Sequence, residues 1–294
     1  MLGVGDDCAL LAPSPGLELA VTTDMLVEGR HFAAGAAPRA LGHKALAVNL
    51  SDLAAMGATP RWALLGLALP SAEEAWLAEF SAGLFALAER FGVELVGGDT
   101  TRSAVRTISV VAIGEVPRGV ALRRGGAKAG DDIWISGELG GAALALRRPQ
   151  SAELARRLHE PEPRVTLGER LRGLAHSAID ISDGLAGDLG HIIDRSQLGA
   201  VVDYAHIPRP ALFGTLADPS LERECLLSGG DDYELLFTAA PERRAQVEHL
   251  SREIHLALTR IGSIQAGAVQ LLVRDAQGRP MPHGGGYDHF RDRA

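Results

Sequence analysis

Apolar and polar residues form two recurring patterns along the chain. Short apolar runs predict β-strands, and longer segments with apolar residues every three or four positions predict helices. The predicted strands are residues 17–22, 62–69, 93–96, 107–115, 132–136, 178–182, 200–204, 233–238, 258–264 and 269–273. The predicted helices are residues 38–56, 71–90, 139–148, 163–175, 185–195 and 241–252. This alternation predicts an α/β protein.

Local signals mark where two of these helices begin and end. Pro38 suits the first turn of the helix over residues 38–56, and Gly57 follows the end of that helix. Ser71 and Glu74 have the spacing of a capping box. That spacing predicts a second helix that begins at Ser71.

The segment between residues 117 and 131 divides the chain into two predicted domains. It combines glycines with arginines and a lysine, and it has no clear periodicity. We interpret it as an interdomain connection with a basic element that faces phosphate. The predicted domains are residues 1–117 and 118–294, and each is expected to be an α/β unit.

Six short acidic clusters stand beside glycine or hydroxyl residues, usually just after an apolar run. They are Gly5-Asp6-Asp7, Thr22-Thr23-Asp24, Asn49-Leu50-Ser51-Asp52, Gly97-Gly98-Asp99-Thr100-Thr101, Asp180-Ile181-Ser182-Asp183-Gly184 and Ser228-Gly229-Gly230-Asp231-Asp232. One such cluster alone is typical of a turn, because Asp tolerates turn geometry. In open α/β sheets, however, ligands bind where strands end, and carboxylate oxygens suit magnesium. Together the clusters predict a site that holds several metal ions against a polyphosphate.

Composition and charge narrow the class of protein. The 294 residues are 46% hydrophobic and carry a formal net charge of −8, which argues against a nucleic acid bound through a general basic surface. The sequence contains no secretory signal and no apolar run of membrane-spanning length, so we expect a soluble cytoplasmic protein that does not bind membranes. Cys8 and Cys225 are too few for a disulfide framework, and we expect both to be reduced and packed.

Common phosphate-binding motifs do not occur in the sequence. It has no GxxxxGK[ST] loop, and Gly3-Val4-Gly5 is too short for a dinucleotide fingerprint. The kinase HRD and DFG patterns are also missing. A phosphotransferase with this sequence therefore belongs to neither the P-loop class nor the protein-kinase class.

The clusters and their flanking residues keep a fixed order along nearly the whole chain. The stretches are GVGDDCALL at 3–11, TTDMLVEGRHF at 22–32, GHKALAVNLSDLAAMGATP at 42–60, GGDTTRS at 97–103, GAKAGDDIWISG at 126–137, AIDISDGLAGDLGHI at 178–192, LSGGDDYELLFT at 227–238 and GYDHF at 286–290. In these stretches the chain resembles the thiamine-monophosphate kinase family, of the superfamily that includes aminoimidazole ribonucleotide synthetase. The blocks at 42–60 and 178–192 distinguish this kinase from its superfamily relatives.

The resemblance implies ATP-dependent phosphorylation of thiamine monophosphate to thiamine diphosphate, by direct in-line transfer without a phosphoenzyme. It implies Mg²⁺ ions bound at Asp7, Thr22, Thr23, Asp24, Asp52, Asp99, Asp180 and Asp183, with Asp24, Asp52 and Asp99 catalytic through the metal. It implies ATP contacts at Gly98, Asp99, Arg124 and Ser182, and thiamine-phosphate contacts at His31, Asp231 and Tyr287. It also implies a homodimer, in which the amino-terminal sheets of two subunits join into a barrel-like core.

Several of these positions have alternative roles. His31 is alternatively a half-buried structural histidine, and Tyr287 a packed tyrosine. Arg123 neighbours Arg124, and either one could face the nucleotide. Asp231 stands where relatives often carry Glu, whose longer side chain reaches further.

Two other classes of function compete with the kinase. A superfamily relative could make selenophosphate or aminoimidazole ribonucleotide, but the selenium enzyme needs a reactive cysteine in a glycine-rich loop, and Cys8 precedes an apolar strand, which predicts packing. A catalytically silent nucleotide-binding module is the other class, and the retained carboxylates argue against it. Relatives carry an additional segment before the first Gly-Asp-Asp motif. We therefore expect either a truncated start or a segment that is dispensable here.

Overall fold

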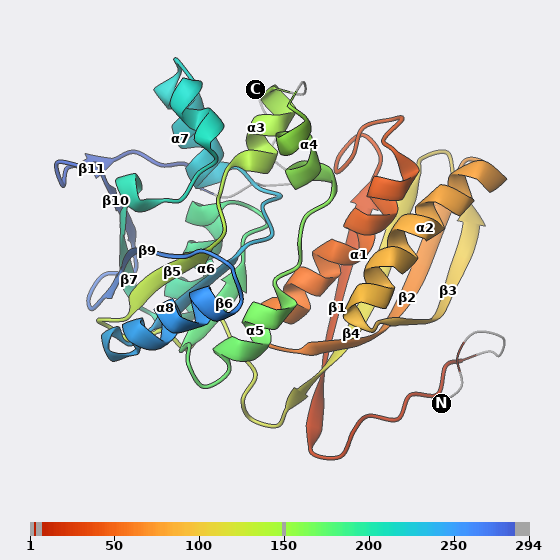
Figure 1. The fold of residues 1–294 in the computed structure, drawn as a ribbon, viewed down its shortest axis with the longest axis horizontal. Helices are drawn as coiled ribbons and strands as arrows, with labels where there is room; N and C mark the ends of the chain where they lie inside the picture. Colours follow the sequence, from red (N-terminus) through yellow and green to blue (C-terminus); the bar gives the residue numbers. More distant parts are fainter. Residues whose placement is uncertain (1–2, 4–7, 149–150, 286–294) are drawn as a thin grey trace. The chain divides into compact units, whose positions relative to one another are not determined.

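Figure 1 shows the computed structural model of the chain, which describes residue 3, residues 8–148 and residues 151–285. The chain forms two compact units. Unit 1 comprises Met1–Ala121 and His159–Val165, and unit 2 comprises Leu122–Leu158 and Thr166–Ala294. Each unit contains a β-sheet and helices, so the predicted α/β class is confirmed.

Unit 1 holds a four-stranded sheet with the order β1-β4-β2-β3. Its strands are β1 (Leu17–Val27), β2 (Thr59–Leu69), β3 (Glu94–Arg102) and β4 (Thr107–Pro117). β2 and β3 are parallel, and the other neighbours are antiparallel. Helices α1 (Pro38–Ala55) and α2 (Glu74–Phe91) pack on one face of this sheet (Figure 1).

The two faces of this sheet differ in exposure. Val110 and Ala112 of β4 are at most 1% exposed beneath the helices. Because side chains alternate along a strand, Leu19, Val21 and Met25 of β1 lie on the opposite face. They are 43%, 63% and 57% exposed. Unit 1 thus has a buried helix-covered face and an apolar face with exposed side chains.

Unit 2 holds a seven-stranded sheet with the order β11-β10-β7-β9-β5-β8-β6. Its strands are β5 (Asp132–Ser136), β6 (Ser177–Asp180), β7 (Gly199–Asp203), β8 (Leu235–Ala239), β9 (Leu258–Gln265), β10 (Leu271–Arg274) and β11 (Pro280–Met281). The α-helices after β4 are α3 (Gly141–Arg147), α4 (Ala152–His159), α5 (Val165–Leu171), α6 (Leu185–Ser196), α7 (Pro219–Ser228) and α8 (Arg244–Glu253), and three 3₁₀ turns lie at Tyr204–His206, Ala211–Thr215 and Pro241–Arg243. Ile135, Ile179 and Leu189, all at most 1% exposed, belong to the core that joins this sheet to α6. None of the described helices has both the length and the apolarity needed to cross a bilayer.

Most predicted strands differ from the observed strands at one or both ends, and the differences in β1, β3 and β8 involve the acidic clusters. β1 continues to Val27 and β3 to Arg102, so the Thr22–Asp24 and Gly97–Asp99 clusters lie within strands instead of after them. Pairing with β4 and β2 carries both strands past their clusters. β8 begins at Leu235 instead of residue 233, because Tyr233 has a φ of +50°, which a strand does not accommodate.

The observed helices differ from the sequence prediction at the start of α2 and in the presence of α4 and α7. The predicted capping box is wrong: α2 begins at Glu74, and the Ser71 hydroxyl donates to the Glu73 carboxylate at 2.7 Å. α4 and α7 were not predicted. At the start of α7 the Asp218 carboxylate accepts hydrogen bonds from the N–H groups of Ser220 and Leu221. Asp before Pro219 is therefore a local signal that could have identified this helix.

The prediction that both cysteines are packed is right for Cys225 and wrong for Cys8. Cys225 is 3% exposed, and burial raises the pKa of its thiol to about 11. Ala9 and Leu11 pack against the cluster of Trp62, Val96 and Ile113 on the sheet of unit 1, whereas Cys8 is exposed. In an extended segment, alternate side chains point to opposite sides, so inward Ala9 and Leu11 leave Cys8 outward. Packing therefore does not explain Cys8.

Candidate active site

In unit 1, helix α1 positions the acidic cluster of β1. Thr22 and Asp24 lie on the face of β1 that meets α1, about 7 Å apart along the strand. The Thr22 hydroxyl donates to Oδ2 of Asp52 on α1. The backbone N–H of Asp24 donates to Oδ1 of Asn49, 3.0 Å away. Thr23 alternates to the opposite face, so these contacts gather Thr22, Asp24 and Asp52 without it.

Asp99 lies at the other edge of the same sheet. The strand register places Asp24 of β1 opposite Val110, Val110 opposite Leu65, and Leu65 opposite Gly98. With about 4.8 Å between neighbouring strands, β1 and β3 are about 14 Å apart at this level. Asp99 is also exposed. A single sheet therefore does not bring Asp99 to the Asp24–Asp52 group.

His31 follows β1 and contacts its end. Its Nδ1 accepts a hydrogen bond from the backbone N–H of Val27 at 3.0 Å. In the neutral ring the proton consequently lies on Nε2. The ring is half-buried, so this contact fixes which nitrogen can donate to a ligand.

In unit 2, the cluster at Asp180 follows the order expected from sequence: a strand end, a loop and a helix. Asp180 ends β6 and is 3% exposed, and Ser182 and Asp183 form the loop before α6. Asp188, in the first turn of α6, accepts hydrogen bonds at Oδ2 from the N–H groups of Ser182 and Asp183, both at 3.1 Å. Burial, together with the charges of Asp180 and Asp183, raises the pKa of Asp188 to about 8.

The Asp231 cluster packs directly against this loop. The N–H of Asp231 donates to the Ser182 carbonyl oxygen at 2.9 Å, and the N–H of Tyr233 donates to the Ile181 carbonyl oxygen at 2.8 Å. An added Cβ on Gly230 would lie 2.2 Å from the Ser182 oxygen, so only glycine fits there. The Tyr233 hydroxyl donates to Oδ1 of Asp231 at 3.0 Å. The structure thus joins two clusters that are about fifty residues apart in sequence.

Asp231 and Tyr233 both have left-handed backbone angles, with φ of +68° and +50°. Residues other than glycine adopt this conformation at a cost, and such residues concentrate at functional sites. Here the surrounding backbone hydrogen bonds hold them. The strained turn over residues 231–233, called the Asp231 turn below, directs the Asp231 carboxylate toward the Tyr233 hydroxyl.

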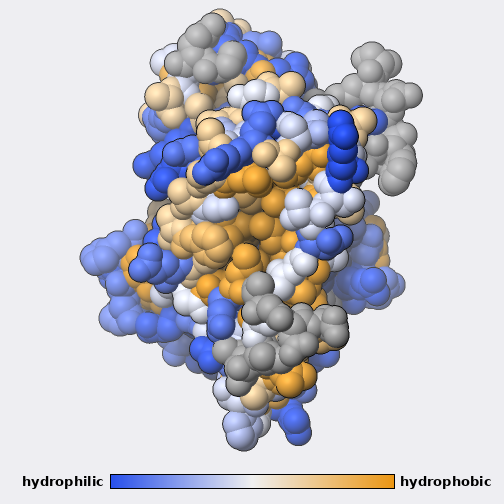
Figure 2. All heavy atoms as spheres, turned by 90° about the vertical axis from the view of Figure 1, so that its right-hand side faces the viewer, coloured by the Kyte–Doolittle hydropathy of each residue, from blue (hydrophilic) through white to orange (hydrophobic). Residues whose placement is uncertain are grey.

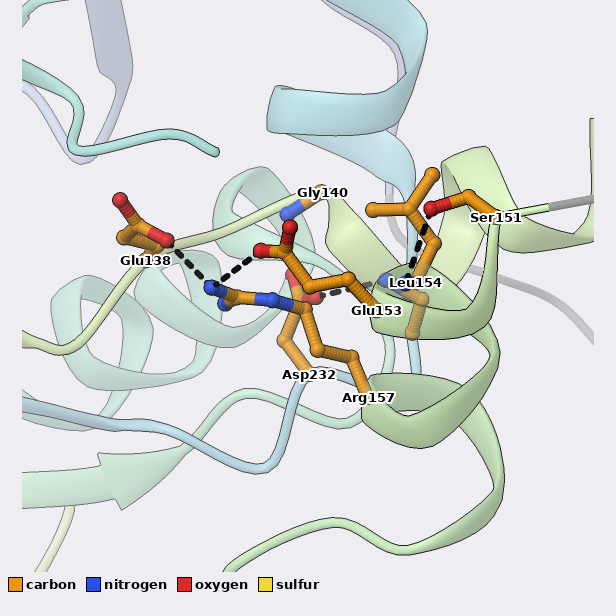
Figure 3. A network of polar contacts seen from close by, with 8 residues as sticks. Glu138, Gly140, Ser151, Glu153, Leu154, Arg157 and Asp232 are labelled. Atoms are coloured by element: carbon orange, nitrogen blue, oxygen red, sulfur yellow. Dashed lines mark hydrogen bonds and ion pairs between the residues drawn. The ribbon is translucent and has the colours of Figure 1, made fainter. Parts of the chain in front are cut away.

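Asp232 faces away from this contact and holds the start of α3. Its carboxylate accepts the N–H groups of Gly140 at 2.7 Å and Ala142 at 3.4 Å. Figure 3 shows Asp232 beside Gly140, with Arg157 of α4 lying between Glu138 and Glu153. The Arg157 guanidinium contacts these carboxylates at 2.5 and 3.4 Å. Asp232 therefore ties the Asp231 turn to α3.

Asp232 should make stability depend on pH. Desolvation raises its pKa to about 8, although the two N–H donors lower it. An unfolded Asp ionises near pH 4, so between about pH 4 and 8 only the folded state keeps the proton, and stability falls as the pH rises through this window. We expect Asp232→Asn to remove this loss, so that its stability relative to the unmodified protein rises by about 4 kcal/mol between pH 5 and 8.5. Thermal unfolding of both proteins at pH 5 and 8.5 measures this difference in stability. If the difference between the variant and the unmodified protein is the same at both pH values, the expectation is contradicted.

Arg124 is exposed, and its positive charge acts on Asp188, whose pKa it lowers. It therefore lies within electrostatic range of the Asp180–Asp188 loop, as a nucleotide contact beside this loop requires. Its neighbour Arg123 accepts the N–H of Ala178 at its carbonyl oxygen, 3.2 Å away. Asp7 and Tyr287 lie outside the described residues.

The oxygen donors of both units fit magnesium chemically. In unit 2, the negative charges of Asp180 and Asp183 raise the pKa of buried Asp188. A divalent cation would offset this repulsion between carboxylates. Within residues 3, 8–148 and 151–285, no group of three or more His, Cys, Asp or Glu side chains is placed to hold a metal ion by itself. Magnesium usually binds through one or two carboxylates, water and substrate phosphates, so this arrangement agrees with its preference.

Three positions that organise these clusters have no role in the sequence prediction: Asn49, Asp188 and Tyr233. Asn49 is fully buried, and its amide also donates to the Ala45 carbonyl at 3.0 Å. Asp188 stands in the first helical turn after an acidic loop, and Tyr233 follows an acidic pair. Both spacings are visible in the sequence, but the partners they contact are not.

Gly98 is required by the sheet, independently of any ligand. An added Cβ would lie 2.0 Å from the Leu65 carbonyl oxygen of β2. We expect Gly98→Ala to destabilise the protein by about 3 kcal/mol, measured by thermal unfolding. Gly97→Ala is the matched control, because its Cβ would meet only the Leu64 side chain, at 3.4 Å. Equal melting temperatures for the two variants would show that this close approach does not matter.

Both units match known families of domains. Residues 5–116 match the AIR synthase related protein, N-terminal domain, and residues 128–273 match the AIR synthase related protein, C-terminal domain. The fold and its acidic loops thus define an AIR synthase related protein. The chain is 44% identical to the thiamine-monophosphate kinase of Escherichia coli (strain K12), over 98% of this chain and 92% of that relative. It belongs to the thiamine-monophosphate kinase family.

Solved structures agree with this assignment. The crystal structure of thiamine-monophosphate kinase from Stenotrophomonas maltophilia K279a matches with a TM-score of 0.89 and 47% identity, covering 96% of this chain and 92% of that chain. The structure of AaThiL complexed with AMPPCP and TMP matches with a TM-score of 0.82 and 31% identity, covering 95% and 89%. These matches, and not the exposure of Cys8, favour the kinase over the selenophosphate-forming relatives.

Proposed function

We propose that the protein transfers the γ-phosphoryl group of ATP to thiamine monophosphate and releases thiamine diphosphate and ADP. The observation that carries this function is the match over 95% of the chain to AaThiL complexed with AMPPCP and TMP, which we take as an ATP analogue and the phosphate acceptor. The acidic clusters agree with that chemistry. The sequence has no P-loop motif, so these clusters are the candidate phosphate-binding elements.

The proposed reaction depends on positioning and charge neutralisation. A phosphate oxygen of thiamine monophosphate attacks the γ-phosphorus of ATP, and the bond from that phosphorus to the bridging oxygen breaks as ADP leaves with the electron pair. A phosphate monoester is largely ionised at neutral pH, since its second pKa is about 6. No side chain therefore has to remove a proton from the attacking oxygen.

The proposed magnesium ligands are residues of the acidic clusters. They are Asp7, Thr22, Thr23, Asp24, Asp52, Asp99, Asp180 and Asp183. These residues would hold magnesium, which would neutralise charge on the phosphate oxygens. The protein's part is orientation: Asn49 holds the backbone of Asp24, and Asp52 accepts the Thr22 hydroxyl.

The proposed ATP contacts are Gly98, Asp99, Arg124 and Ser182, and the proposed thiamine-monophosphate contacts are His31, Asp231 and Tyr287. A carboxylate at Asp231 suits the cationic thiamine ring system. Its shorter side chain compared with Glu is held by the Tyr233 hydroxyl at 3.0 Å. His31 offers the N–H of Nε2 to an acceptor such as phosphate.

We also propose that two copies form the working unit. Leu19, Val21 and Met25 form an exposed apolar face on β1. An exposed apolar surface of this kind is typical of a protein–protein interface. Figure 2 shows a broad hydrophobic area on one face of the molecule. A second copy of this sheet is an apolar partner of the same size. Two such four-stranded sheets can close into a barrel.

The sheet order suggests how that barrel joins. β1 and β3 are the two edge strands, and Asp24 and Asp99 lie on opposite edges of one sheet. If β1 pairs with β3 of the second copy, Asp99 of the partner subunit comes beside Asp24 and Asp52. We propose this arrangement, because it gathers ligands that one sheet keeps about 14 Å apart.

The direct test is a product assay. The purified protein is incubated with ATP, Mg²⁺ and thiamine monophosphate, and thiamine diphosphate is followed by chromatography. We expect one ADP for each thiamine diphosphate, and no product in the presence of EDTA. Product no higher than that of the Asp24→Asn variant would overturn the proposed function.

A further inference from the structure

Asp188 is a buried carboxylate for which the proposed reaction has no role as a ligand. It is 2% exposed and lies in the first turn of α6. Burying a carboxylate is unfavourable unless it makes hydrogen bonds. Its Oδ2 accepts two, from the backbone N–H groups of Ser182 and Asp183, each at 3.1 Å.

These contacts are not an ordinary helix cap. A capping side chain stands at the start of its helix and accepts N–H groups of the first turn. Here the start of α6 is Gly184, which has no side chain, and the carboxylate reaches back to residues before it. Asp188 therefore holds the loop that precedes the helix.

The other side of the same loop carries the Asp231 turn. Both backbone polar groups of Ser182 are hydrogen-bonded. Its N–H donates to Asp188, and its carbonyl oxygen accepts from the N–H of Asp231 at 2.9 Å. Gly230 packs against the same carbonyl, where an added Cβ would lie 2.2 Å away. A shift of Ser182 must therefore displace Asp231.

We propose that Asp188 is a positioning residue that holds Ser182 and Asp183 for the nucleotide and, through the Ser182 carbonyl, holds Asp231 for the phosphate acceptor. The role of each held residue rests on the proposed function. Loss of the Asp188 carboxylate should consequently weaken the binding of both substrates, although Asp188 touches neither.

Three variants on one helix test this role. Asp188→Ala removes both acceptors, and Asp188→Asn keeps a carbonyl oxygen. Asp194→Asn changes an exposed carboxylate on the same helix and is the matched control. Calorimetry with AMPPCP and Mg²⁺ measures nucleotide affinity without turnover, and steady-state kinetics give KM for each substrate. If Asp188→Ala melts below the assay temperature, Asp188→Val replaces it, since it fills the space with apolar atoms.

We expect Asp188→Ala to bind AMPPCP about tenfold more weakly and to raise KM for both substrates about tenfold, with a smaller fall in kcat. Asp188→Asn should stay within about threefold of the unmodified protein, and Asp194→Asn should match it. An unchanged AMPPCP affinity in Asp188→Ala, or an equal loss in Asp188→Asn, would overturn the proposal. Absence of kinase activity in the unmodified protein would overturn the proposed function instead, while the AMPPCP measurement still tests Asp188.

Discussion

Asp24→Asn is expected to lower kcat/KM at least about 1,000-fold, because it removes a carboxylate ligand of the magnesium that would offset the repulsion between two anionic substrates. A loss of this size corresponds to about 4 kcal/mol of transition-state stabilisation. The substitution keeps the shape of the side chain. It also keeps the backbone N–H that donates to Asn49 and the pairing of β1 with β4.

The measurement is steady-state formation of thiamine diphosphate at saturating Mg²⁺, with a melting curve for each variant. Glu18→Gln is the matched control, since Glu18 is an exposed carboxylate on the same strand. It should retain nearly full activity. If Asp24→Asn stays within tenfold of the unmodified protein while both variants melt alike, Asp24 is not a catalytic ligand.

Mixing two inactive variants should restore about a quarter of full activity. In a two-fold dimer whose site combines Asp24 with Asp99 of the partner subunit, the Asp24→Asn/Asp99→Asn heterodimer has one site with both changes and one intact site. Random exchange makes about half of the dimers heterodimers, and half of their sites are intact. The fraction of intact sites in the mixture is therefore about one quarter, which gives about 25% of the unmodified activity.

The experiment mixes the two variants in equal amounts under conditions that allow subunit exchange and then assays them. Glu94→Gln, at an exposed carboxylate on the same strand as Asp99, checks that β3 tolerates substitution. Each variant assayed alone gives the baseline. If the mixture stays at that baseline although exchange is verified by a tagged subunit, Asp24 and Asp99 serve one site from the same subunit.

Much of the framework followed from local sequence signals. The strand over Asp132–Ser136 was predicted at its observed bounds, since a continuous apolar run marks a strand buried on both faces. Helix α1 was predicted from Pro38 to within one residue of its end, because proline and glycine act on their own backbone. The order of acidic clusters likewise pointed to a metal-assisted phosphoryl transfer.

The sequence by itself determined most of the element types, the acidic clusters and the family, because these depend on residue chemistry and on neighbours along the chain. Only the tertiary structure decided which clusters meet. It placed the Asp231 turn on the Ser182 loop, put Asp24 and Asp99 at opposite edges of one sheet, and buried Asp188 behind the loop that it holds. Those outcomes depend on strand order and on backbone hydrogen bonds between distant segments, which no local pattern encodes.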